Sequence, residues 1–300
     1  NLRIYYMDHE PFASGYYRCI LPGIAMQQQC MAEAVFRENL LRPEFSNEQH
    51  AKLVTEAINW ANVLVLERQY DPEAEKFVEK VLERSSKAVV WEVDDYVHDV
   101  PEGSPIKKFW TPDRVQSMTS LMKKVSALTV STPRMKKKFE DLTGTPTYCI
   151  PNYIDFGNLR WKYARVDNKD KVKIGYLAGP THGIDLEVIR EPLRIVLQRN
   201  PNVTFKCVGY QPEWISELPP DQVEQDAQYY DLLNYPKKMT DFDIGVAPLL
   251  DVPFNVTGKS PLKTLEYGVL RIPTVSSCIE PNRSEIIPGE TGFLARDNRD

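Results

Sequence analysis

Short apolar runs alternate with amphipathic stretches along both halves of this 300-residue chain. The apolar runs of the first half are nearly continuous, which is typical of strands covered on both faces. The predicted strands are Leu2–Met7, Val63–Glu67, Ala88–Val93, Ala127–Ser131 and Thr147–Ile150. The predicted helices between them are Tyr16–Gln29, Asn47–Trp60, Pro72–Arg84, Thr111–Lys123 and Pro133–Leu142. This order predicts a parallel sheet with right-handed crossovers.

A polar, irregular stretch interrupts the alternation after Pro151. We interpret it as a linker, with a first domain at 1–155, the linker at 156–171 and a second domain at 172–300. The second domain has predicted strands at Val172–Leu177, Val203–Val208, Asp243–Ala247, Thr274–Ser276 and Gly292–Ala295, and predicted helices at Ile184–Arg199 and Pro261–Leu270. The first of these helices has a predicted core stripe of Ile189, Leu193, Val196 and Leu197. Two doubly wound α/β domains place a cleft between them, where ligands bind outside the carboxyl ends of the strands.

Composition narrows the class of protein. Hydrophobic residues make up 42% and charged residues 26%, as in ordinary globular proteins, and no apolar run reaches the roughly 18–20 residues that span a bilayer. The five cysteines have neither metal-site nor disulfide spacing, so we interpret them as buried reduced thiols of a cytoplasmic protein. Three N-x-S/T sequons are interpreted as coincidental, at Asn202, Asn255 and Asn282.

A basic stretch stands out against the net charge of −5. Residues 105–141 carry nine basic and three acidic side chains. Such a stretch suits an anionic acceptor, DNA, or the inner surface of a membrane. A solvated helix surface is the alternative, and the negative net charge argues against an overall attraction to nucleic acid.

A glycine-containing loop after the first predicted strand of the second domain is the strongest local signal for a ligand. It reads GYLAGPTHG from Gly175 to Gly183 and precedes a predicted helix. Glycines let a backbone approach a ligand closely, and N–H groups at a helix start favour an anion. Gly179 and Thr181 would line this loop, and His182 could donate to a phosphate oxygen. The alternative is a plain strand-to-helix turn, since the spacing is neither a Rossmann nor a Walker A loop.

The segment KSPLKTLE, which begins at Lys259, combines a helix start with charged side chains. Ser260 is the predicted N-cap, with Pro261 at the first helical position. Lys263 and Glu266 follow on the helix. Positive groups suit a diphosphate and a carboxylate suits ribose hydroxyls, whereas the alternative is a surface ion pair between Lys263 and Glu266. The predicted core face of the helix is Leu262, Leu265 and Val269.

The first half offers weaker candidates. Asp94, Asp95 and His98 follow the third predicted strand. Clustered carboxylates raise one another's pKa and could hold a metal or hydroxyls or act as a base, with loop capping as the alternative. Gly15 and Arg18 stand where a glycine turn opens the first helix, so Arg18 could reach the cleft or remain a surface arginine.

Five segments of the second half share their pattern with a known family. They read IGYLAGPTHGIDL, DIGVAPL, FNVTGKSPLKTLEY, IPTVS and GETGFL, and begin at Ile174, Asp243, Phe254, Ile272 and Gly289. Looser matches in the first half read VWEVDD, ALTVST and IPNYID, and begin at Val90, Ala127 and Ile150. These segments resemble the GT-B glycosyltransferases of the group 1, or GT4-like, type. The resemblance implies two Rossmann-like domains, a sugar nucleotide held mainly by the second, and transfer with retention and without metal.

The resemblance assigns roles to particular residues. Glu266 matches the second glutamate of the family's E-x7-E element, which is expected on the ribose, whereas Gly258 stands in place of the first glutamate. The arginine and lysine that usually hold the diphosphate are absent from the glycine-containing loop. His182 stands near the place of that lysine, and Lys259 and Lys263 would supply the missing charge. The family also continues into C-terminal helices, so we expect the natural chain to extend beyond the printed sequence.

The leading hypothesis is a glycosyltransferase that moves a sugar from a nucleoside-diphosphate sugar to an acceptor hydroxyl, with no other cofactor. The acceptor is left open among a glycan, a lipid-linked sugar, a protein and a hydroxymethylated DNA base. Asp94, Asp95 and His98 would face the acceptor. Glu92, Asp94 and Asp95 are similar to the metal-binding motif of GT-A enzymes, but the layout assigns the donor to the other domain. A sugar-nucleotide epimerase of GT-B architecture and a non-enzymatic two-domain ligand-binding protein are the alternatives.

Overall fold

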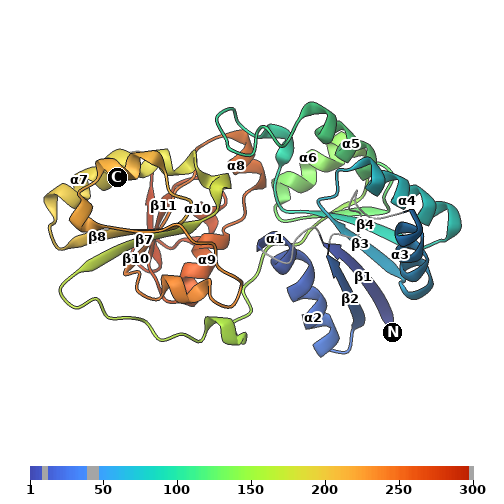
Figure 1. Cartoon of the computed structure of the whole chain (residues 1–300), viewed down its shortest axis with the longest axis horizontal. Helices are drawn as coiled ribbons and strands as arrows, with labels where there is room; N and C mark the ends of the chain where they lie inside the picture. The colour runs from blue at the N-terminus through green and yellow to red at the C-terminus, as the bar shows by residue number, and fades with distance from the viewer. Residues whose placement is uncertain (9–12, 39–46, 297–300) are drawn as a thin grey trace. The chain divides into compact units, whose positions relative to one another are not determined.

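The computed structural model of the chain describes residues 1–8, 13–38 and 47–296. Its contacts divide the chain into two compact units, which are residues 1–98 with 110–152, and residues 99–109 with 153–300. Each unit contains a six-stranded sheet in which all the paired strands run parallel (Figure 1). The predicted fold class, α/β with two Rossmann-like sheets, is confirmed.

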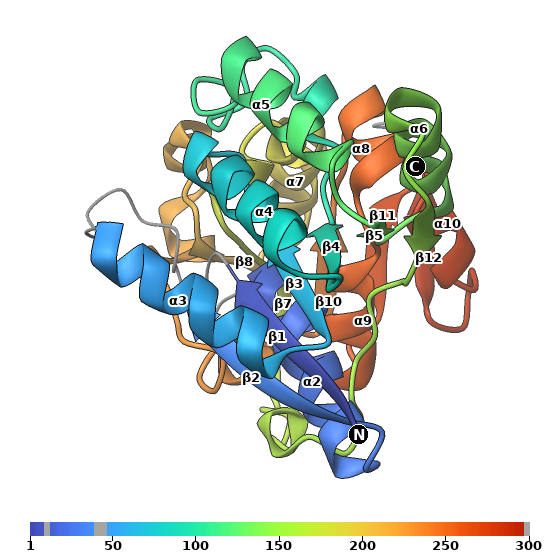
Figure 2. The same ribbon diagram turned by 90° about the vertical axis from the view of Figure 1, so that its right-hand side faces the viewer.

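The sheet of the first unit has its first strand inside rather than at the edge. The strand order is β2 (Ala32–Glu38), β1 (Leu2–Asp8), β3 (Val63–Glu67), β4 (Ala88–Val93), β5 (Ala127–Val130) and β6 (Thr147–Cys149). Its helices are α1 (Ala13–Gly15), α2 (Leu21–Gln28), α3 (Asn47–Trp60), α4 (Pro72–Arg84), α5 (Pro112–Met122) and α6 (Pro133–Thr143). Figure 2 shows α3 and α4 on one face of the sheet and α2 on the other. Successive side chains of β1 follow these faces, since Tyr5 meets Trp60 of α3 and Tyr6 stacks on Phe36 of β2.

Two features of the first unit differ from the sequence prediction. Strand β2 was not predicted, because its sequence AEAVFRE mixes charges with apolar residues, as suits an edge strand that is only partly covered. The predicted helix Tyr16–Gln29 is instead a π-helical turn at Tyr16–Ile20 followed by α2, and the short helix α1 precedes both. Gly15 therefore makes no sharp turn, because it has ordinary right-handed helical angles.

The sheet of the second unit runs in the order β12 (Gly292–Ala295), β11 (Thr274–Ser277), β10 (Ile244–Ala247), β7 (Val172–Ala178), β8 (Val203–Gly209) and β9 (Val223–Asp226). Its α-helices are α7 (Arg190–Arg199), α8 (Pro253–Gly258), α9 (Leu262–Val269) and α10 (Asn282–Glu285). Short 3₁₀ turns join these elements, at Leu159–Trp161, Pro180–His182, Asp185–Ile189, Glu213–Glu217, Pro220–Gln222 and Pro236–Met239. Another such turn, Val97–Asp99, lies at the boundary between the units.

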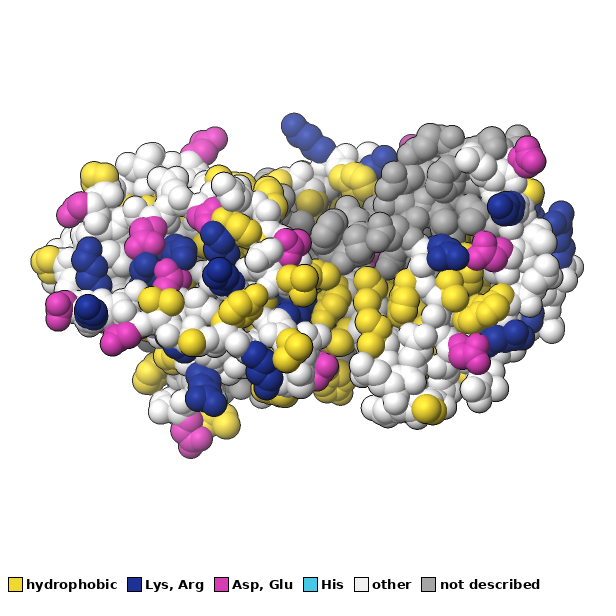
Figure 3. Space-filling view, turned by 60° about the horizontal axis from the view of Figure 1, so that its bottom comes forward, with side chains coloured by type: hydrophobic (Ala, Val, Ile, Leu, Met, Phe, Trp, Pro, Cys, Tyr) yellow, Lys and Arg dark blue, Asp and Glu magenta, His cyan; other side chains and the backbone are white. Residues whose placement is uncertain are grey.

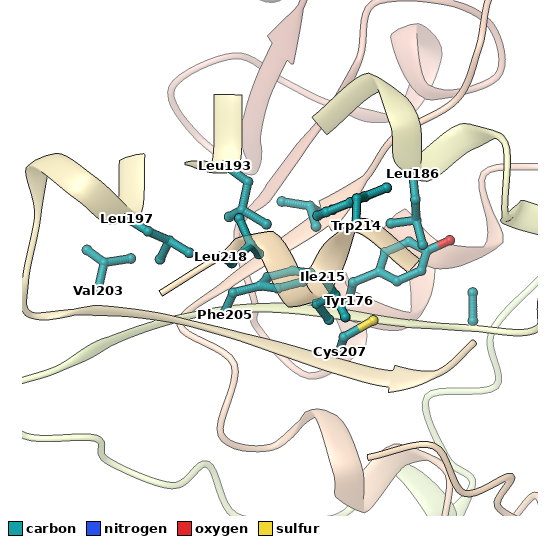
Figure 4. Close-up of a cluster of buried hydrophobic side chains, with 12 residues drawn as sticks. Tyr176, Leu186, Leu193, Leu197, Val203, Phe205, Cys207, Trp214, Ile215 and Leu218 are labelled. Atoms are coloured by element: carbon teal, nitrogen blue, oxygen red, sulfur yellow. The ribbon is translucent and has the colours of Figure 1, made fainter. Parts of the chain in front are cut away.

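Two apolar clusters cover the two faces of this sheet. On one face Leu193 and Leu197 of α7 pack with Tyr176 and Phe205 (Figure 4). On the other face Tyr267 of α9 and Leu270, the residue after that helix, pack with Leu177 and Val208, which alternate along their strands with Tyr176 and Phe205. Figure 1 shows α7 and α9 on opposite sides of these strands. This double burial explains why the strands are continuous apolar runs in the sequence.

The second unit departs from the prediction where helices start. The predicted helix Ile184–Arg199 is regular only from Arg190, after a 3₁₀ turn, and Val196 of its predicted core stripe is 37% exposed. Helices α8 and α10 and strand β9 were not predicted, because all three are short and carry no clear period. Residues 156–171 pack with the second unit, where Trp161 is buried and the Val166 N–H donates to the Thr240 carbonyl.

The face in Figure 3 carries interspersed acidic and basic side chains. Within the basic stretch 105–141, Lys124, Lys136 and Lys137 form ion pairs with glutamate or aspartate side chains. These pairs neutralise part of its charge.

The thiols also differ from the prediction: all five cysteines are free, but only Cys19 and Cys207 are buried, and Cys30 is exposed.

Paired glycines on two adjacent strands allow aromatic rings to lie directly against the sheet. Gly175 of β7 stands opposite Gly245 of β10. A Cβ atom at Gly175 would lie 2.0 Å from the Phe242 ring, and one at Gly245 would lie 2.5 Å from the Tyr267 ring. Gly175 therefore serves packing inside the sheet, rather than the close approach of a ligand that the sequence suggested.

We expect Gly175→Ala to destabilise the second unit by about 1–3 kcal/mol, because the added methyl group overfills the space that Phe242 occupies. Gly179→Ala is the matched control. Its Cβ would meet no atom within 4 Å, and Gly179 is not among the described positions of positive φ. Urea denaturation of both variants measures the difference, and equal stabilities would contradict the packing role of Gly175.

Candidate functional site

A buried carboxylate joins two segments at the carboxyl ends of the adjacent strands β7 and β10. Asp185 is 1% exposed. Its Oδ1 accepts hydrogen bonds from the Leu250 N–H at 3.0 Å and from Asn255 Nδ2 at 2.7 Å. Its Oδ2 lies 3.1 Å from His182 Nδ1. Asp185 thereby fixes the glycine-containing loop against the chain that leads into α8 and Lys259.

His182 is a neutral imidazole at pH 7. Partial burial and the positive charges of Lys263 and Lys259 together lower its pKa to about 4, against the raising effect of Asp185. A carboxylate only accepts hydrogen bonds, so the proton of the neutral ring lies on Nδ1 and is donated to Asp185. Nε2 is then an acceptor. This differs from the expectation that His182 donates to a phosphate oxygen, which would require the protonated ring.

Two lysines complete this group. Lys263 Nζ donates to the Leu177 carbonyl at 3.1 Å, at the end of β7, and lies 5.4 Å from the centre of the Tyr176 ring. Burial lowers the pKa of Lys263 to about 8, an effect that Lys259 strengthens and Glu266 opposes. Lys259 is 8% exposed and its Nζ lies 4.8 Å from the Phe254 ring centre. Both predicted lysines are thus drawn into the unit beside His182.

Glu266 is buried rather than placed on a solvated face. It is 4% exposed, and its Oε2 accepts a hydrogen bond from the Tyr235 hydroxyl at 2.8 Å. The alternative of a surface ion pair with Lys263 is therefore wrong. The predicted core face of α9 is confirmed only in part, because Leu262, Leu265 and Val269 are only half-buried and, of the three, Val269 packs against the apolar cluster of Tyr267. The buried residues of the helix are instead Thr264, Glu266 and Tyr267.

The other residues of the predicted donor site lie at the same edge of the sheet. The helices there do not start at the predicted residues. α9 begins at Leu262 with Pro261 at the cap position, so Ser260 is not the N-cap. Gly179 precedes the 3₁₀ turn Pro180–His182, which contains the half-buried Thr181, and a second 3₁₀ turn follows in place of a long helix. Proline and the interactions of Asp185 favour tight turns here, so α7 starts away from the loop.

In the first unit the predicted carboxylates gather around an arginine that the sequence reading missed. Arg68 lies 3.7 Å from Asp94 Oδ1, 3.9 Å from Asp95 Oδ2 and 2.8 Å from Glu67 Oε1. It has a positive φ of 44° directly after β3. Burial raises the pKa of Asp94 to about 7; Arg68 opposes this rise, and Asp95 and Glu67 add to it. The sequence signal that could have identified Arg68 as a site residue is its position at the end of a buried strand.

His98 lies in an aromatic group. Its ring stacks on Tyr96 at 5.2 Å between centroids and meets Phe139 edge-on at 5.4 Å. The Thr119 hydroxyl donates to the Val115 carbonyl, so it accepts from His98 Nε2–H across 2.9 Å. The ring is therefore held by packing and by Thr119.

Arg18 points into the first unit, where it is 6% exposed. Its Nε and Nη2 donate to Glu92 at 2.6 and 3.1 Å, and Nη1 donates to the Asn152 side chain at 2.9 Å and to the Ile150 carbonyl. The expectation that Arg18 reaches out to an acceptor, or lies free on the surface, is not met. A planar guanidinium suits this multidentate burial better than a lysine would.

We expect Asp94→Asn to raise the melting temperature at pH 8 and to change it much less at pH 5. The pKa of Asp94 is about 7 in the fold, against about 4 in the unfolded chain. The stabilisation from binding this proton is complete below pH 4 and is lost as the pH rises through 7. Asp94→Asn removes the free-energy cost of burying the ionised Asp94 carboxylate, which is about 1–4 kcal/mol at pH 8. Asp141→Asn, at an exposed aspartate, is the control, and a gain that is equal at both pH values would contradict the pKa.

Two kinds of feature are absent from the described residues, which are a cluster of metal ligands and a membrane-spanning helix. In residues 1–8, 13–38 and 47–296 no group of three or more His, Cys, Asp or Glu side chains is arranged to hold a metal ion. Within the same ranges, no helix has the length and apolar character needed to cross a membrane.

Comparison with solved structures shows which fold these two sheets form. The chain matches a sucrose-phosphate synthase from Thermosynechococcus elongatus with a TM-score of 0.66 and 11% identity, over 100% of this chain and 87% of that one. The chain has the GT-B fold. The match to an α-glucosyltransferase in complex with UDP and a 13-mer DNA containing an HMU base has a TM-score of 0.62 and 13% identity, over 99% and 83% of the chains. The match to a lipopolysaccharide outer core galactosyltransferase has a TM-score of 0.57 and 12% identity, and it covers 100% of this chain and 88% of that one.

These GT-B proteins resemble the chain in structure rather than in sequence. No protein-family model and no curated protein sequence matches it. At 11–13% identity, the likeness concerns the fold, so the function has to be argued from the side chains.

Proposed function

We propose that this GT-B protein is a glycosyltransferase that moves a sugar from a nucleoside-diphosphate sugar to an acceptor hydroxyl. One observation carries the proposal. At the carboxyl edge of the second sheet, Lys263 donates to the Leu177 carbonyl at the end of β7, Lys259 is buried just before the helix of Lys263, and the buried carboxylate Glu266 follows on that helix. Cations for a diphosphate and a carboxylate for a ribose are the groups that a sugar nucleotide requires.

Each residue of this edge has a proposed role. Lys259 and Lys263 bind the diphosphate and stabilise the charge that develops on it as the glycosidic bond breaks. Gly179, Thr181 and Ser260 contact the diphosphate through backbone N–H and hydroxyl groups. Glu266 accepts the ribose hydroxyls. His182 accepts a hydrogen bond from a sugar hydroxyl at Nε2, because Asp185 holds Nδ1–H.

The first unit is proposed to supply the acceptor side. Asp94 and Asp95 offer carboxyl oxygens to the acceptor hydroxyl, and the raised pKa of Asp94 lets it exchange a proton near pH 7. Arg18 and Gly15 support this site from the interior, and His98 contributes through its packing. Retention at the anomeric carbon and independence from metal remain part of the proposal, as does a cytoplasmic location, which the free thiols support.

The acceptor class is proposed from chemistry. A glycan, a lipid-linked sugar or a hydroxymethylated DNA base each presents a hydroxyl group. DNA is included because one structural neighbour is described with DNA that contains an HMU base. A lipopolysaccharide-like glycan is included because another neighbour is a lipopolysaccharide galactosyltransferase.

Incubation with UDP-, GDP-, dTDP- and ADP-sugars tests the function, each with and without these acceptors. Nucleoside diphosphate released only in the presence of an acceptor supports transfer. An altered sugar nucleotide without an acceptor would identify an epimerase, and binding without turnover would identify a ligand-binding protein. Activity in EDTA is expected to be full. Activity that is lost in EDTA and restored by Mn²⁺ would overturn metal independence.

A further inference from the structure

The buried carboxylate Glu266 receives its hydrogen bond from a distant loop. Tyr235 lies 31 positions earlier in the chain, between β9 and the 3₁₀ turn Pro236–Met239, and its hydroxyl donates to Oε2 at 2.8 Å. Burying a carboxylate is costly unless it is hydrogen-bonded. A hydroxyl–carboxylate bond is charge-assisted, so it also fixes the plane of the carboxyl group.

The loop that carries Tyr235 is held by its own hydrogen bonds. The Asp231 side chain accepts from the backbone N–H groups of Leu233 and Asn234 at 2.8 and 2.9 Å, and its carbonyl accepts from the Tyr235 N–H at 2.9 Å. The Tyr163 hydroxyl donates to the Leu233 carbonyl at 3.0 Å. Tyr235 thus approaches Glu266 from a fixed turn rather than from a free chain.

Helix α9 fixes Glu266 from the other side. The neighbouring residue Tyr267 is 1% exposed and its ring lies against Gly245 of β10. A glycine there lets the helix approach the sheet closely, and the Phe242 ring packs 6.3 Å from the Tyr267 ring. Both partners of the Tyr235–Glu266 bond are therefore held by elements that are themselves anchored.

We propose that Tyr235 is a positioning residue that aims the Glu266 carboxylate at two vicinal ribose hydroxyls, so that this protein selects ribonucleoside diphosphates over their 2′-deoxy analogues. The inference rests on the proposed function, because it takes Glu266 as the ribose ligand. A carboxylate has lone pairs enough for Tyr235 and for both hydroxyls. An analogue that lacks one hydroxyl leaves a buried carboxylate oxygen unpaired, and such sites discriminate strongly.

Calorimetric titration with UDP, GDP and ADP and with their 2′-deoxy forms tests the proposal. For the base that binds, we expect the wild type to prefer the ribonucleotide by tenfold or more. Tyr235→Phe keeps the ring and removes the hydroxyl, so it should weaken ribonucleotide binding about fivefold to tenfold and leave the deoxy form nearly unchanged. A purely structural role would weaken both forms alike. Tyr230→Phe is the matched control, because its hydroxyl bonds Asp226 instead.

Glu266→Gln tests the ribose role of Glu266 separately from the positioning role of Tyr235. If it removes the preference for ribose while Tyr235→Phe leaves that preference intact, the positioning role is overturned and the proposed donor site stands. If Glu266→Gln also leaves the preference intact, the ribose role fails and the inference fails with it. If no nucleotide binds to a wild-type protein that melts cooperatively, the proposed function itself is overturned.

Discussion

Arg18→Met is expected to lower the free energy of unfolding of the first unit by about 3–5 kcal/mol, because it leaves the Glu92 carboxylate buried without its cation. Arg18 and Glu92 have side chains that are each 3% exposed, and two N–H···O contacts join them. Burial raises the pKa of Glu92 even though Arg18 opposes the rise. Loss of Arg18 should raise that pKa further, so the destabilisation should be smaller at pH 5 than at pH 8.

Two further variants make this result specific. Arg37→Met removes a partner of an exposed ion pair, whose side chains are 46% and 39% exposed, and should cost less than about 1 kcal/mol. The double variant Arg18→Met/Glu92→Gln should recover part of the lost stability, because no unpaired charge remains. Urea denaturation at both pH values measures all three variants. An Arg18→Met loss as small as that of Arg37→Met would show that the pair is not buried as described.

Lys259→Ala is expected to raise the dissociation constant for the sugar nucleotide about tenfold or more, through loss of about 1.5–3 kcal/mol of charge-assisted hydrogen bonding. Lys263→Met should have an effect of similar size. Both lysines act on His182, so both would lie at the diphosphate. Lys171→Met is the control, because it removes the same charge from an exposed position at the opposite end of β7.

The pH dependence of binding separates the two lysines. The pKa of Lys263 is lowered to about 8, so its charge is lost as the pH rises through 8. Wild-type affinity for the nucleoside diphosphate should therefore fall above that pH, and this fall should be reduced in Lys263→Met. Calorimetric titrations at pH 7 and pH 9 measure it. Unchanged affinity in both Lys259→Ala and Lys263→Met would place the diphosphate elsewhere.

The elements with the clearest periodicity were predicted to the residue. Strands Val63–Glu67 and Ala88–Val93 and helices Asn47–Trp60 and Pro72–Arg84 have the predicted bounds. The elements that were missed are short or lie at the edge of a sheet, and they are β2, β9, α1, α8 and α10. Burial imposes a readable pattern only where a whole face or both faces are covered.

The candidate donor residues could be predicted because they follow strands, and the carboxyl ends of parallel strands meet at one edge. The glycine-containing loop follows β7, and the chain that leads to Lys259 follows β10, its neighbour in the sheet. Side-chain direction could not be predicted in the same way. Arg18 turned out to be buried on Glu92, which is 74 positions away.

The sequence by itself determined the two parallel α/β arrays and the segments that hold the candidate site, because strand and helix periods are local and record burial directly. Only the tertiary structure decided the partners of its charged groups. Asp185 meets Asn255 across 70 positions and Tyr235 meets Glu266 across 31. Burial and the two neighbouring lysines decided that His182 is neutral, and packing decided that Glu266 is buried. The physical reason is that a charged side chain takes its protonation state and orientation from whatever packs around it, and those neighbours come from distant elements that no local pattern encodes.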